Sequence, residues 1–400
     1  MTRSDLHHRQ TDDPSRARIA VIGLGGRGRY FAHAFDRHPR AELVAVADPW
    51  DKPLALLRHQ YGDRIRYYQD YHEMLQASDI DAVVVASNDK SHRENAVAVF
   101  EAGKHCLLEK PMAQSVADCD EIIRAWKQSG RLFMIGLELR HCSLFTRMRE
   151  LVDDGRIGEI VMGQALDNVS VGGQYFYHND MRRKEYVRSL LLQKGTHTID
   201  LLNWFMGGTP TKVYASGGLD FYGQREPNDK RCRTCEQRCE YFINHERFVM
   251  DYGAVIETDD RCVFAEECDV ADNSLLLIDY ANGHRGQYSE CHFTPEYTRE
   301  FTFFGTDGKM YGFYNNECNF LIRCTYRNTD HVDEWHPASA GGGHGGGDRL
   351  IMEHFLDCVL GDEQPLADVQ AARDCTAVAA AAEESIETGQ AVAIPPCPYL

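Results

Sequence analysis

The stretch Ile19-Ala-Val-Ile-Gly-Leu-Gly-Gly-Arg-Gly28 decides the fold of the first part of this chain. A short β-branched run ends at Gly23, and Gly23, Gly25 and Gly28 form the pattern G-x-G-x-x-G before a helical pattern over residues 29–37. In a strand–turn–helix context the first glycine permits a tight turn, the second lets the backbone approach a pyrophosphate, and the third lets helix and strand pack closely. Since a helix N-terminus also offers free N–H groups to phosphates, the stretch predicts a dinucleotide-binding turn.

Asp48 supplies the carboxylate that such a turn needs. It ends a second predicted strand, residues 42–48, twenty residues after Gly28. An aspartate at this position binds the hydroxyls of the adenosine ribose and repels the additional 2′-phosphate of NADP, so we predict NAD as the cofactor. Gly26 and Arg27 complete the turn, where Arg27 is expected to contact either the pyrophosphate or the additional phosphate of NADP.

Strand and helix patterns alternate over residues 18–136, which predicts a doubly wound parallel sheet. In such a sheet, ligands bind beyond the carboxyl ends of the strands. We therefore expect the polar residues that follow the predicted strands to converge on the cofactor. They are Asp48, Ser87, Asn88, His92, Glu109 and Lys110.

The pattern changes after about residue 137. Strand-like runs joined by turns occupy residues 212–324, and one long helix is predicted over residues 186–205. Two more helices, at residues 348–360 and 368–388, close the chain. The sequence thus predicts a disordered leader over residues 1–17, a dinucleotide-binding domain over 18–137, and an α/β domain with a mostly antiparallel open sheet over 138–400.

The composition of the 400 residues is that of a globular protein, with 43% hydrophobic and 26% charged residues. A formal net charge of −18 argues against a nucleic-acid partner, and the chain lacks the run of about 18 apolar residues that spans a membrane. The N-terminus has no apolar core of a signal peptide. We therefore expect a cytoplasmic protein whose 14 cysteines are reduced thiols.

Four features together resemble the glucose–fructose oxidoreductase and inositol dehydrogenase family, Gfo/Idh/MocA. They are the glycine turn with its aspartate, the stretch Glu101-Ala-Gly-Lys-His-Cys-Leu-Leu-Glu-Lys-Pro111, the stretch Gly195-Thr-His-Thr-Ile-Asp-Leu-Leu-Asn-Trp204, and the order of the two domains. The second stretch is similar to the family's A-G-K-H-V-x-x-E-K-P signature. The resemblance covers roughly residues 18–394 and implies a Rossmann domain followed by a sheet domain that pairs subunits into a homodimer or homotetramer. It also implies a nicotinamide enzyme that oxidises a polyol, usually a sugar, sugar derivative or cyclitol.

The resemblance implies that Lys110 and His197 perform the reaction. Without it, the sequence would favour an exposed loop lysine at Lys110 and a packed helix histidine at His197. Oxidation of an alcohol requires that a proton leaves the oxygen as hydride leaves the carbon, and a histidine with a pKa of roughly 6.5 suits this at neutral pH. A positioned lysine can hold the substrate oxygen and stabilise charge on it.

Gln193 is a departure from the family. Many relatives carry an aspartate one turn before the histidine, whereas Gln193 can neither carry charge nor accept a proton, although it should still touch the substrate. Lys194 becomes a second candidate cation, and Asp200 either orients the imidazole of His197 or serves its own helix. The reaction therefore stays open between a sugar or cyclitol dehydrogenase and a glycosidase or lyase that uses held NAD for a transient oxidation. A non-catalytic NAD-binding sensor is the third alternative.

Two segments near the predicted site have open assignments. Tyr175, His178 and Arg182 belong to a polar and aromatic segment that either binds a sugar or forms a subunit interface. His344, in the stretch Gly341-Gly-Gly-His-Gly-Gly-Gly-Asp348, either reaches the pocket on a mobile loop or lies in a flexible linker with Asp348 as the cap of the next helix.

The cysteine spacing raises the question of a metal. Cys232, Cys235 and Cys239 lie close enough in sequence to suggest a structural zinc site, with His245, Cys262 or Cys268 as the fourth ligand. An iron–sulfur cluster or a redox-sensitive group of thiols is a weaker alternative. The three thiols would otherwise lie in a loop without a metal.

Overall fold

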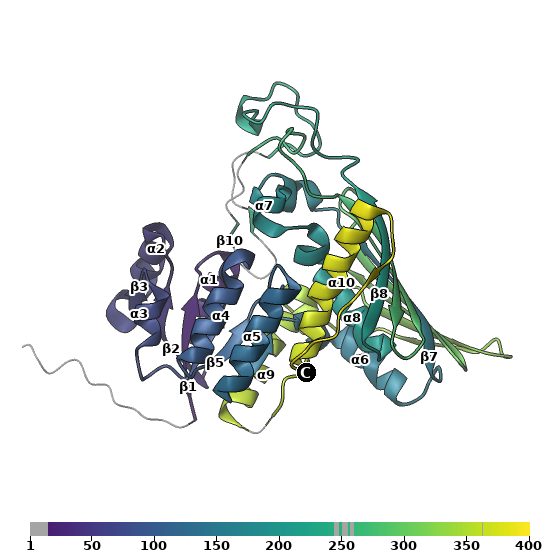
Figure 1. Cartoon of the computed structure of the whole chain (residues 1–400), viewed down its shortest axis with the longest axis horizontal. Coiled ribbons are helices and arrows are strands. Elements are labelled where there is room, and N and C mark those ends of the chain that lie inside the picture. Colours follow the sequence, from purple (N-terminus) through teal and green to yellow (C-terminus); the bar gives the residue numbers. More distant parts are fainter. Residues whose placement is uncertain (1–14, 244–247, 250–254, 257–259, 362) are drawn as a thin grey trace, which may run out of the picture.

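The structure is a computed structural model that describes residues 15–243, 248–249, 255–256, 260–361 and 363–400 (Figure 1). Most of the predicted leader, residues 1–14, and the candidate zinc ligand His245 lie outside the described residues. Within the described part of the chain, no helix combines the length and the apolar character that crossing a membrane requires.

The first domain is built on a six-stranded sheet in the order β3-β2-β1-β4-β5-β6, and all its strand pairs are parallel. The strands are β1 (Ala17–Ile22), β2 (Ala41–Ala47), β3 (Arg66–Tyr68), β4 (Ala82–Val85), β5 (His105–Leu108) and β6 (Phe133–Ile135). The strand order runs outward in opposite directions from β1 and β4, and the crevice between these two strands is the point where such sheets bind dinucleotides. The predicted doubly wound parallel sheet is confirmed.

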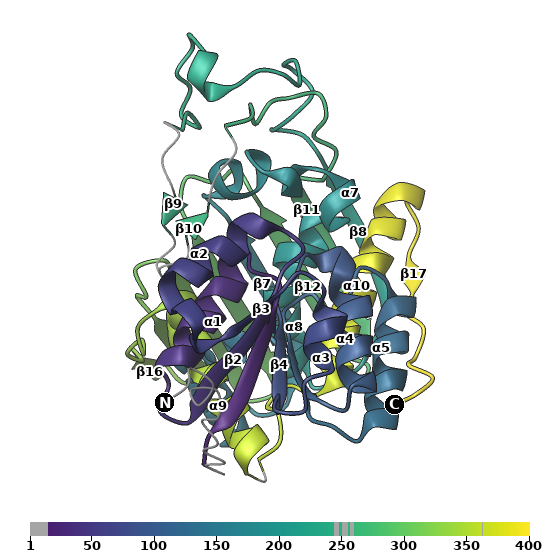
Figure 2. The same cartoon turned by 90° about the vertical axis from the view of Figure 1, so that its left-hand side faces the viewer.

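Helices cover both faces of this sheet (Figure 2). On one face α1 (Gly26–Arg37) and α2 (Asp51–Tyr61) pack beside α9 (Gly347–Leu360), a helix from near the end of the chain whose Phe355 meets Phe35 of α1 with ring centroids 6.4 Å apart. The other face carries α3 (Tyr71–Leu75), α4 (His92–Glu101) and α5 (Val116–Ser129). Because α9 packs beside α1, the residues just before α9 are held close to the glycine turn.

The second domain is built on a nine-stranded sheet in the order β16-β15-β14-β13-β7-β12-β11-β8-β17. Only the β7–β12 pair of this sheet is parallel, so the predicted mostly antiparallel sheet is confirmed. Its strands are β7 (Ile160–Asn168), β8 (Pro210–Gly218), β11 (Asn273–Tyr280), β12 (Arg285–Cys291), β13 (Thr298–Gly305), β14 (Gly308–Asn315), β15 (Leu321–Tyr326), β16 (Val332–Trp335) and β17 (Val392–Ala393). Two short strands, β9 (Phe248–Val249) and β10 (Val255–Ile256), form a separate pair.

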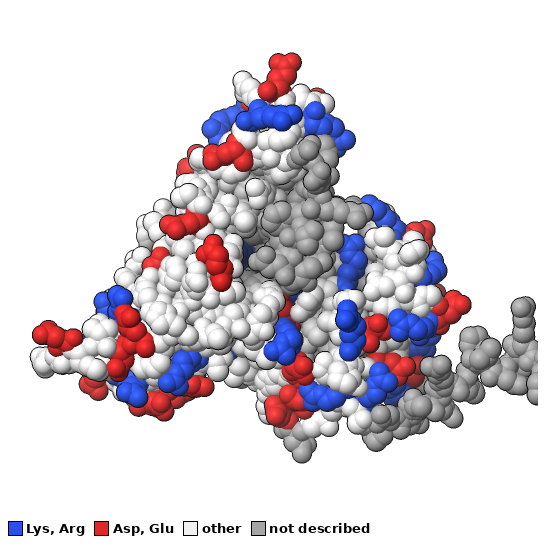
Figure 3. Space-filling model, turned by 180° about the vertical axis from the view of Figure 1, so that it is seen from behind, with Lys and Arg blue, Asp and Glu red and all other residues white. Residues whose placement is uncertain are grey.

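One face of this sheet is covered and the other is open. The helices α6 (Ser143–Asp153), α8 (Thr196–Met206) and α10 (Val369–Thr388) pack on the covered face around a shared apolar core. On the open face the neighbouring strands β8 and β11 leave Tyr214, Leu275 and Leu277 about half exposed. Figure 3 shows a broad area with few charged side chains over this domain.

The predicted helix over residues 186–205 is broken in the structure. It consists of α7 (Lys184–Val187), a π-helical turn over Leu191–Gly195, and α8. The break occurs at Arg188, which has a φ of 60° and reaches out to Glu383 and to the carbonyl oxygen of Gln114. These tertiary contacts outweigh the helical pattern of the local sequence. The wide turn places Gln193 and Lys194 just before His197.

Candidate active site

A cavity of about 870 Å³ lies between the strand ends of the first domain and α8 of the second. It brings together most of the residues predicted from the sequence. From the first domain it is lined by Gly23, Gly25, Gly26, Arg27, Asp48, Ser87, Asn88, His92, Glu109 and Lys110, and from the second by Tyr175, Gln193, Lys194, His197 and His344.

The three glycines of the turn have different surroundings, and these fit a bound pyrophosphate. Gly23 has a φ of +85°, and a Cβ atom at Gly28, outside the cavity lining, would lie 1.7 Å from the carbonyl oxygen of Gly23. A Cβ atom at Gly25 would meet no atom within 4 Å. Because α1 begins here without an acidic residue in its first turn and without a side-chain cap, its N-terminus and the space beside Gly25 suit an anion.

Asp48 is held in place by the backbone of the cofactor site. Its Oδ2 accepts a hydrogen bond of 2.7 Å from Leu24 N–H, and its Oδ1 accepts one of 2.9 Å from Trp50 N–H. Each carboxylate oxygen can accept a further hydrogen bond, as binding of ribose hydroxyls requires. Trp50, which the sequence argument did not single out, lines the same end of the cavity and is 71% exposed.

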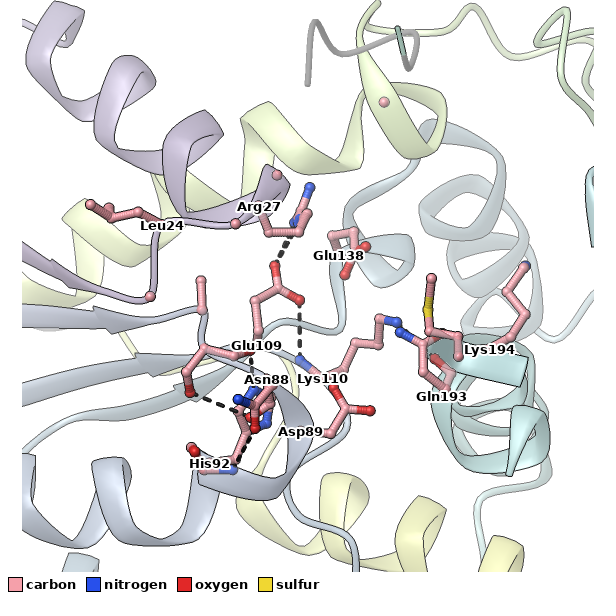
Figure 4. A pocket seen from close by; sticks show the side chains of 18 of the residues that line it. Leu24, Arg27, Asn88, Asp89, His92, Glu109, Lys110, Glu138, Gln193 and Lys194 are labelled. Atoms are coloured by element: carbon pink, nitrogen blue, oxygen red, sulfur yellow. Dashed lines mark hydrogen bonds and ion pairs between the residues drawn. The ribbon is translucent and has the colours of Figure 1, made fainter. Parts of the chain in front are cut away.

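Arg27 has partners within the protein. Its guanidinium lies 2.7 Å from Glu109 Oε1 (Figure 4). It also lies 2.8 Å from Asp348 Oδ1. These ion pairs connect the glycine turn to the end of β5 and to α9. The phosphate contact expected of Arg27 stays a prediction.

Lys110 extends from the end of β5 toward the second domain (Figure 4). Its Nζ donates a hydrogen bond of 2.7 Å to the carbonyl oxygen of Gln193, and the Lys110–Pro111 peptide is cis. Burial lowers the pKa of Lys110, and the carboxylates of Asp89 and Glu109 counteract this in part. The Lys110 amine therefore reaches from the first domain to the backbone of the second, at the cavity wall.

His197 lies on α8 and is only 3% exposed. Burial, together with the nearby cation of Lys110, lowers the pKa of His197 well below its ordinary value, so the imidazole is uncharged at neutral pH. Its Nδ1 has no hydrogen-bond partner among the described residues, and its Nε2 lies 3.7 Å from Glu138 Oε1. The uncharged imidazole can accept a hydrogen bond or a proton at Nδ1, but its lowered pKa makes it a weaker base than the ordinary histidine expected from the sequence.

Two neighbours of His197 have partners of their own. Lys194 donates a hydrogen bond of 3.0 Å to the Tyr297 hydroxyl and lies 3.3 Å from Asp167. Asp200 does not orient the imidazole, because both of its oxygens accept hydrogen bonds from Arg140, at 2.7 and 2.9 Å. Asp200 does not cap its own helix either, because it lies within α8 and pairs with Arg140 outside that helix.

His344 reaches the cavity, which decides between the two alternatives for the glycine-rich stretch. Its φ of 52° lies in the left-handed region, and its Nδ1 is 3.0 Å from both Glu138 Oε1 and Asp348 Oδ1. Asp348 is not the helix cap, since α9 begins one residue before it, with Gly346 as the cap. Burial alone would raise the pKa of Asp348, but Arg27 and His344 bring it below its ordinary value.

The structure does not bring His178 and Arg182 to this cavity. The ring nitrogens of His178 lie 2.6 and 2.8 Å from the carbonyl oxygens of Arg261 and Tyr241. Arg182 is fully buried and pairs with Glu267. Both residues stabilise the long segment between β8 and β11. Of the three candidate residues in this segment, only Tyr175 lines the cavity.

The predicted zinc site is not supported. Cys232, Cys235, Cys239 and Cys262 line one small cavity of about 20 Å³. However, among the described residues no group of three potential ligand atoms within 4.8 Å of one another contains any of these thiols. Cys268 instead donates a weak hydrogen bond to the carbonyl oxygen of Val263.

Glu138 is a second cavity residue, after Trp50, that was not predicted from the sequence. It lies three residues after the end of β6, is 1% exposed, and lies beside Arg27 in Figure 4. Burial raises the pKa of Glu138, an effect that His344 and Arg27 counteract in part. Its position after a predicted strand is the same signal that identified Asp48 and Lys110.

Comparisons with known proteins agree with this geometry. An oxidoreductase family with an NAD-binding Rossmann fold matches residues 17–137, and the C-terminal α/β domain of the same family matches residues 149–394. YteT of Bacillus subtilis is 27% identical over 386 residues, which cover 84% of this chain and 88% of YteT. Myo-inositol 2-dehydrogenase of Thermotoga maritima is 28% identical over 211 residues, which cover 50% of this chain and 58% of that enzyme.

Solved structures share the fold over nearly the whole chain. An oxidoreductase domain protein from Kribbella flavida has a TM-score of 0.75 at 19% identity, covering 96% of this chain and 100% of its own. A levoglucosan dehydrogenase, solved with NADH and levoglucosan, has a TM-score of 0.73 at 18% identity and covers 95% and 100%. Since the family's two domains together match most of the sequence, this chain belongs to the Gfo/Idh/MocA oxidoreductase family.

Proposed function

We propose that this protein is an NAD-dependent oxidoreductase that oxidises a secondary alcohol of a sugar, a sugar derivative or a cyclitol. One observation carries the proposal. Lys110 and His197 come from different domains, yet Lys110 is hydrogen-bonded to the carbonyl oxygen of Gln193, one helical turn before His197, in the cavity that begins at the glycine turn. Related proteins named myo-inositol 2-dehydrogenase and levoglucosan dehydrogenase support this class of substrate.

Each cavity residue has a distinct part in this proposal. A bound nicotinamide supplies the acceptor for the hydride. The ammonium of Lys110 donates a hydrogen bond to the substrate oxygen and stabilises negative charge that develops there. His197 is uncharged at neutral pH and accepts the hydroxyl proton. Gln193 positions the substrate through its amide. The names of the relatives give no support to the alternative of a glycosidase or lyase, which we do not propose.

The proposed activity predicts that NAD is reduced in the presence of a suitable polyol. A panel of inositols, aldoses, sugar acids and anhydrosugars, assayed by NADH absorbance with NAD and separately with NADP, tests this. We expect turnover with at least one polyol and a preference for NAD, because Asp48 repels a 2′-phosphate. Measurable NAD binding without turnover on any member of the panel would contradict the proposal and favour a sensor.

We also propose that the open face of the second sheet pairs two subunits. Tyr214, Leu275 and Leu277 expose apolar surface on neighbouring strands, at 46, 56 and 58%. Burying a leucine side chain stabilises an interface by roughly 1.5–3 kcal/mol, and a twofold axis uses each residue twice.

Replacing both Leu275 and Leu277 by glutamate should therefore convert a dimer or tetramer into smaller species, which light scattering after gel filtration would measure. Leu56→Glu is the matched control, since Leu56 is 47% exposed on α2, away from this sheet. A wild-type monomer, or an unchanged mass of the double variant, would refute the proposed interface.

A further inference from the structure

Three side chains from separate elements bring potential metal ligands together at the inner end of the cavity. Glu138 follows β6, His197 lies on α8, and His344 lies in the glycine-rich turn before α9. One donor atom from each residue lies within 4.8 Å of the other two. Donor atoms that share one tetrahedral ion lie roughly 3.4 Å apart at ordinary bond lengths, so small side-chain rotations would close the site.

The carboxylate of Glu138 has few partners for a buried anion. Glu138 is 1% exposed and faces the cavity, its Oε1 lies 3.0 Å from His344 Nδ1, and its Oε2 has no hydrogen-bond partner among the residues that the structure describes. The same is true of Nδ1 of His197 within the described part of the chain. A buried polar group without a partner costs about 1–3 kcal/mol, and more when it is charged. Such groups indicate a ligand that completes the site.

The charged groups around Glu138 favour a bound cation. Glu138 lies near the carboxylates of Glu109 and Asp348 and near the guanidinium of Arg27. Arg27 already lies between Glu109 and Asp348. A cation bound beside Glu138 would therefore stabilise a carboxylate whose pKa is raised by burial and by its neighbours Glu109 and Asp348.

We propose that Glu138, His197 and His344 bind a divalent first-row transition-metal ion. Two imidazoles and one carboxylate are a ligand set for zinc, manganese or ferrous iron, and three protein ligands leave coordination positions open toward the cavity. Asp348, 3.0 Å from His344 Nδ1, would orient that imidazole, as carboxylates commonly do behind metal-binding histidines.

The site goes beyond the proposed function, in which His197 acts as a base without a metal. An ion at this position could hold two neighbouring hydroxyls of a polyol at its open positions. His197 is then a ligand, so the ion and a proton compete for the same imidazole. The loaded site would bind a polyol whether or not hydride is transferred.

Titration of the full-length, chelator-treated protein with Mn²⁺ tests the inference, with the loss of the electron paramagnetic resonance signal of free Mn²⁺ as the readout. Manganese is chosen because thiolates, such as those of Cys232 and Cys235, bind it poorly. We expect one ion per chain. Glu138→Gln and His344→Asn should each weaken binding at least about tenfold. Thermal unfolding by circular dichroism shows that each variant is folded, and if one is not, the other carries the test.

His354→Asn is the control, because His354 forms the other histidine pair of the described residues, with His141 at 2.8 Å. It should bind Mn²⁺ as the wild type does. No saturable binding to the wild type, or equal binding by Glu138→Gln, His344→Asn and the wild type, would overturn the inference. Manganese binding by the wild type, together with no NAD reduction on any polyol by either the metal-free or the loaded protein, would count against the proposed function alone.

Discussion

Replacing Lys110 by methionine should lower kcat/KM for the polyol by about 10³-fold. Methionine keeps much of the length of the side chain but removes the ammonium that faces the substrate oxygen. The hydrogen bond to the carbonyl oxygen of Gln193 is lost as well, so the π-helical turn before α8 and the end of β5 lose one direct contact. Because the glycine turn and Asp48 stay intact, the dissociation constant of NAD should change no more than about threefold. Steady-state kinetics and NAD titration by fluorescence measure the two quantities.

Lys90→Met is the matched control for this experiment. Lys90 lies at the neighbouring strand end, over the ring of Tyr186, and does not line the cavity. Its removal should leave kcat/KM within about twofold, as surface substitutions usually do. A Lys110→Met enzyme that retains a tenth or more of wild-type kcat/KM would mean that Lys110 does not act on the reacting oxygen.

The parts of the site that the sequence predicted well follow from rules that act over short distances. The glycine turn depends on the conformations of three residues, and it occupies the predicted place between β1 and α1. Asp48 and Lys110 converge because the carboxyl ends of parallel strands share one edge of a sheet. Glu138 lies beyond the carboxyl end of β6, at the same edge of the sheet, so the same rule would have identified it.

Contacts between distant residues account for what the sequence did not predict. Helical periodicity places Asp200 one turn after His197, but its partner Arg140 lies 60 residues away in the sequence. His178 stands in a polar segment that suits a sugar, yet the irregular chain between β8 and β11 surrounds it. The spacing of the cysteines cannot show whether their sulfur atoms reach a common centre.

Alanine at Gly25 should weaken NAD binding, whereas alanine at Gly28 should destabilise the fold. Gly25 has a φ of −64° and a ψ of −165°, which alanine adopts without strain, and an added Cβ atom would meet no atom within 4 Å. We therefore expect Gly25→Ala to fold with an unchanged melting temperature. Its methyl group would occupy space where a pyrophosphate approaches the backbone, so NAD affinity should fall by about 10- to 100-fold, equivalent to about 1.4–2.8 kcal/mol.

Gly28→Ala should instead damage the fold of the turn. Its Cβ atom would lie 1.7 Å from the carbonyl oxygen of Gly23, and backbone atoms cannot move away as the end of a flexible side chain can. We expect a loss of more than about 3 kcal/mol in the free energy of unfolding, seen as a lower melting temperature without any ligand. Thermal unfolding and NAD titration of both variants separate the two effects. If Gly25→Ala binds NAD as tightly as the wild type does, the pyrophosphate does not pass beside Gly25, and the dinucleotide must cross the sheet edge elsewhere.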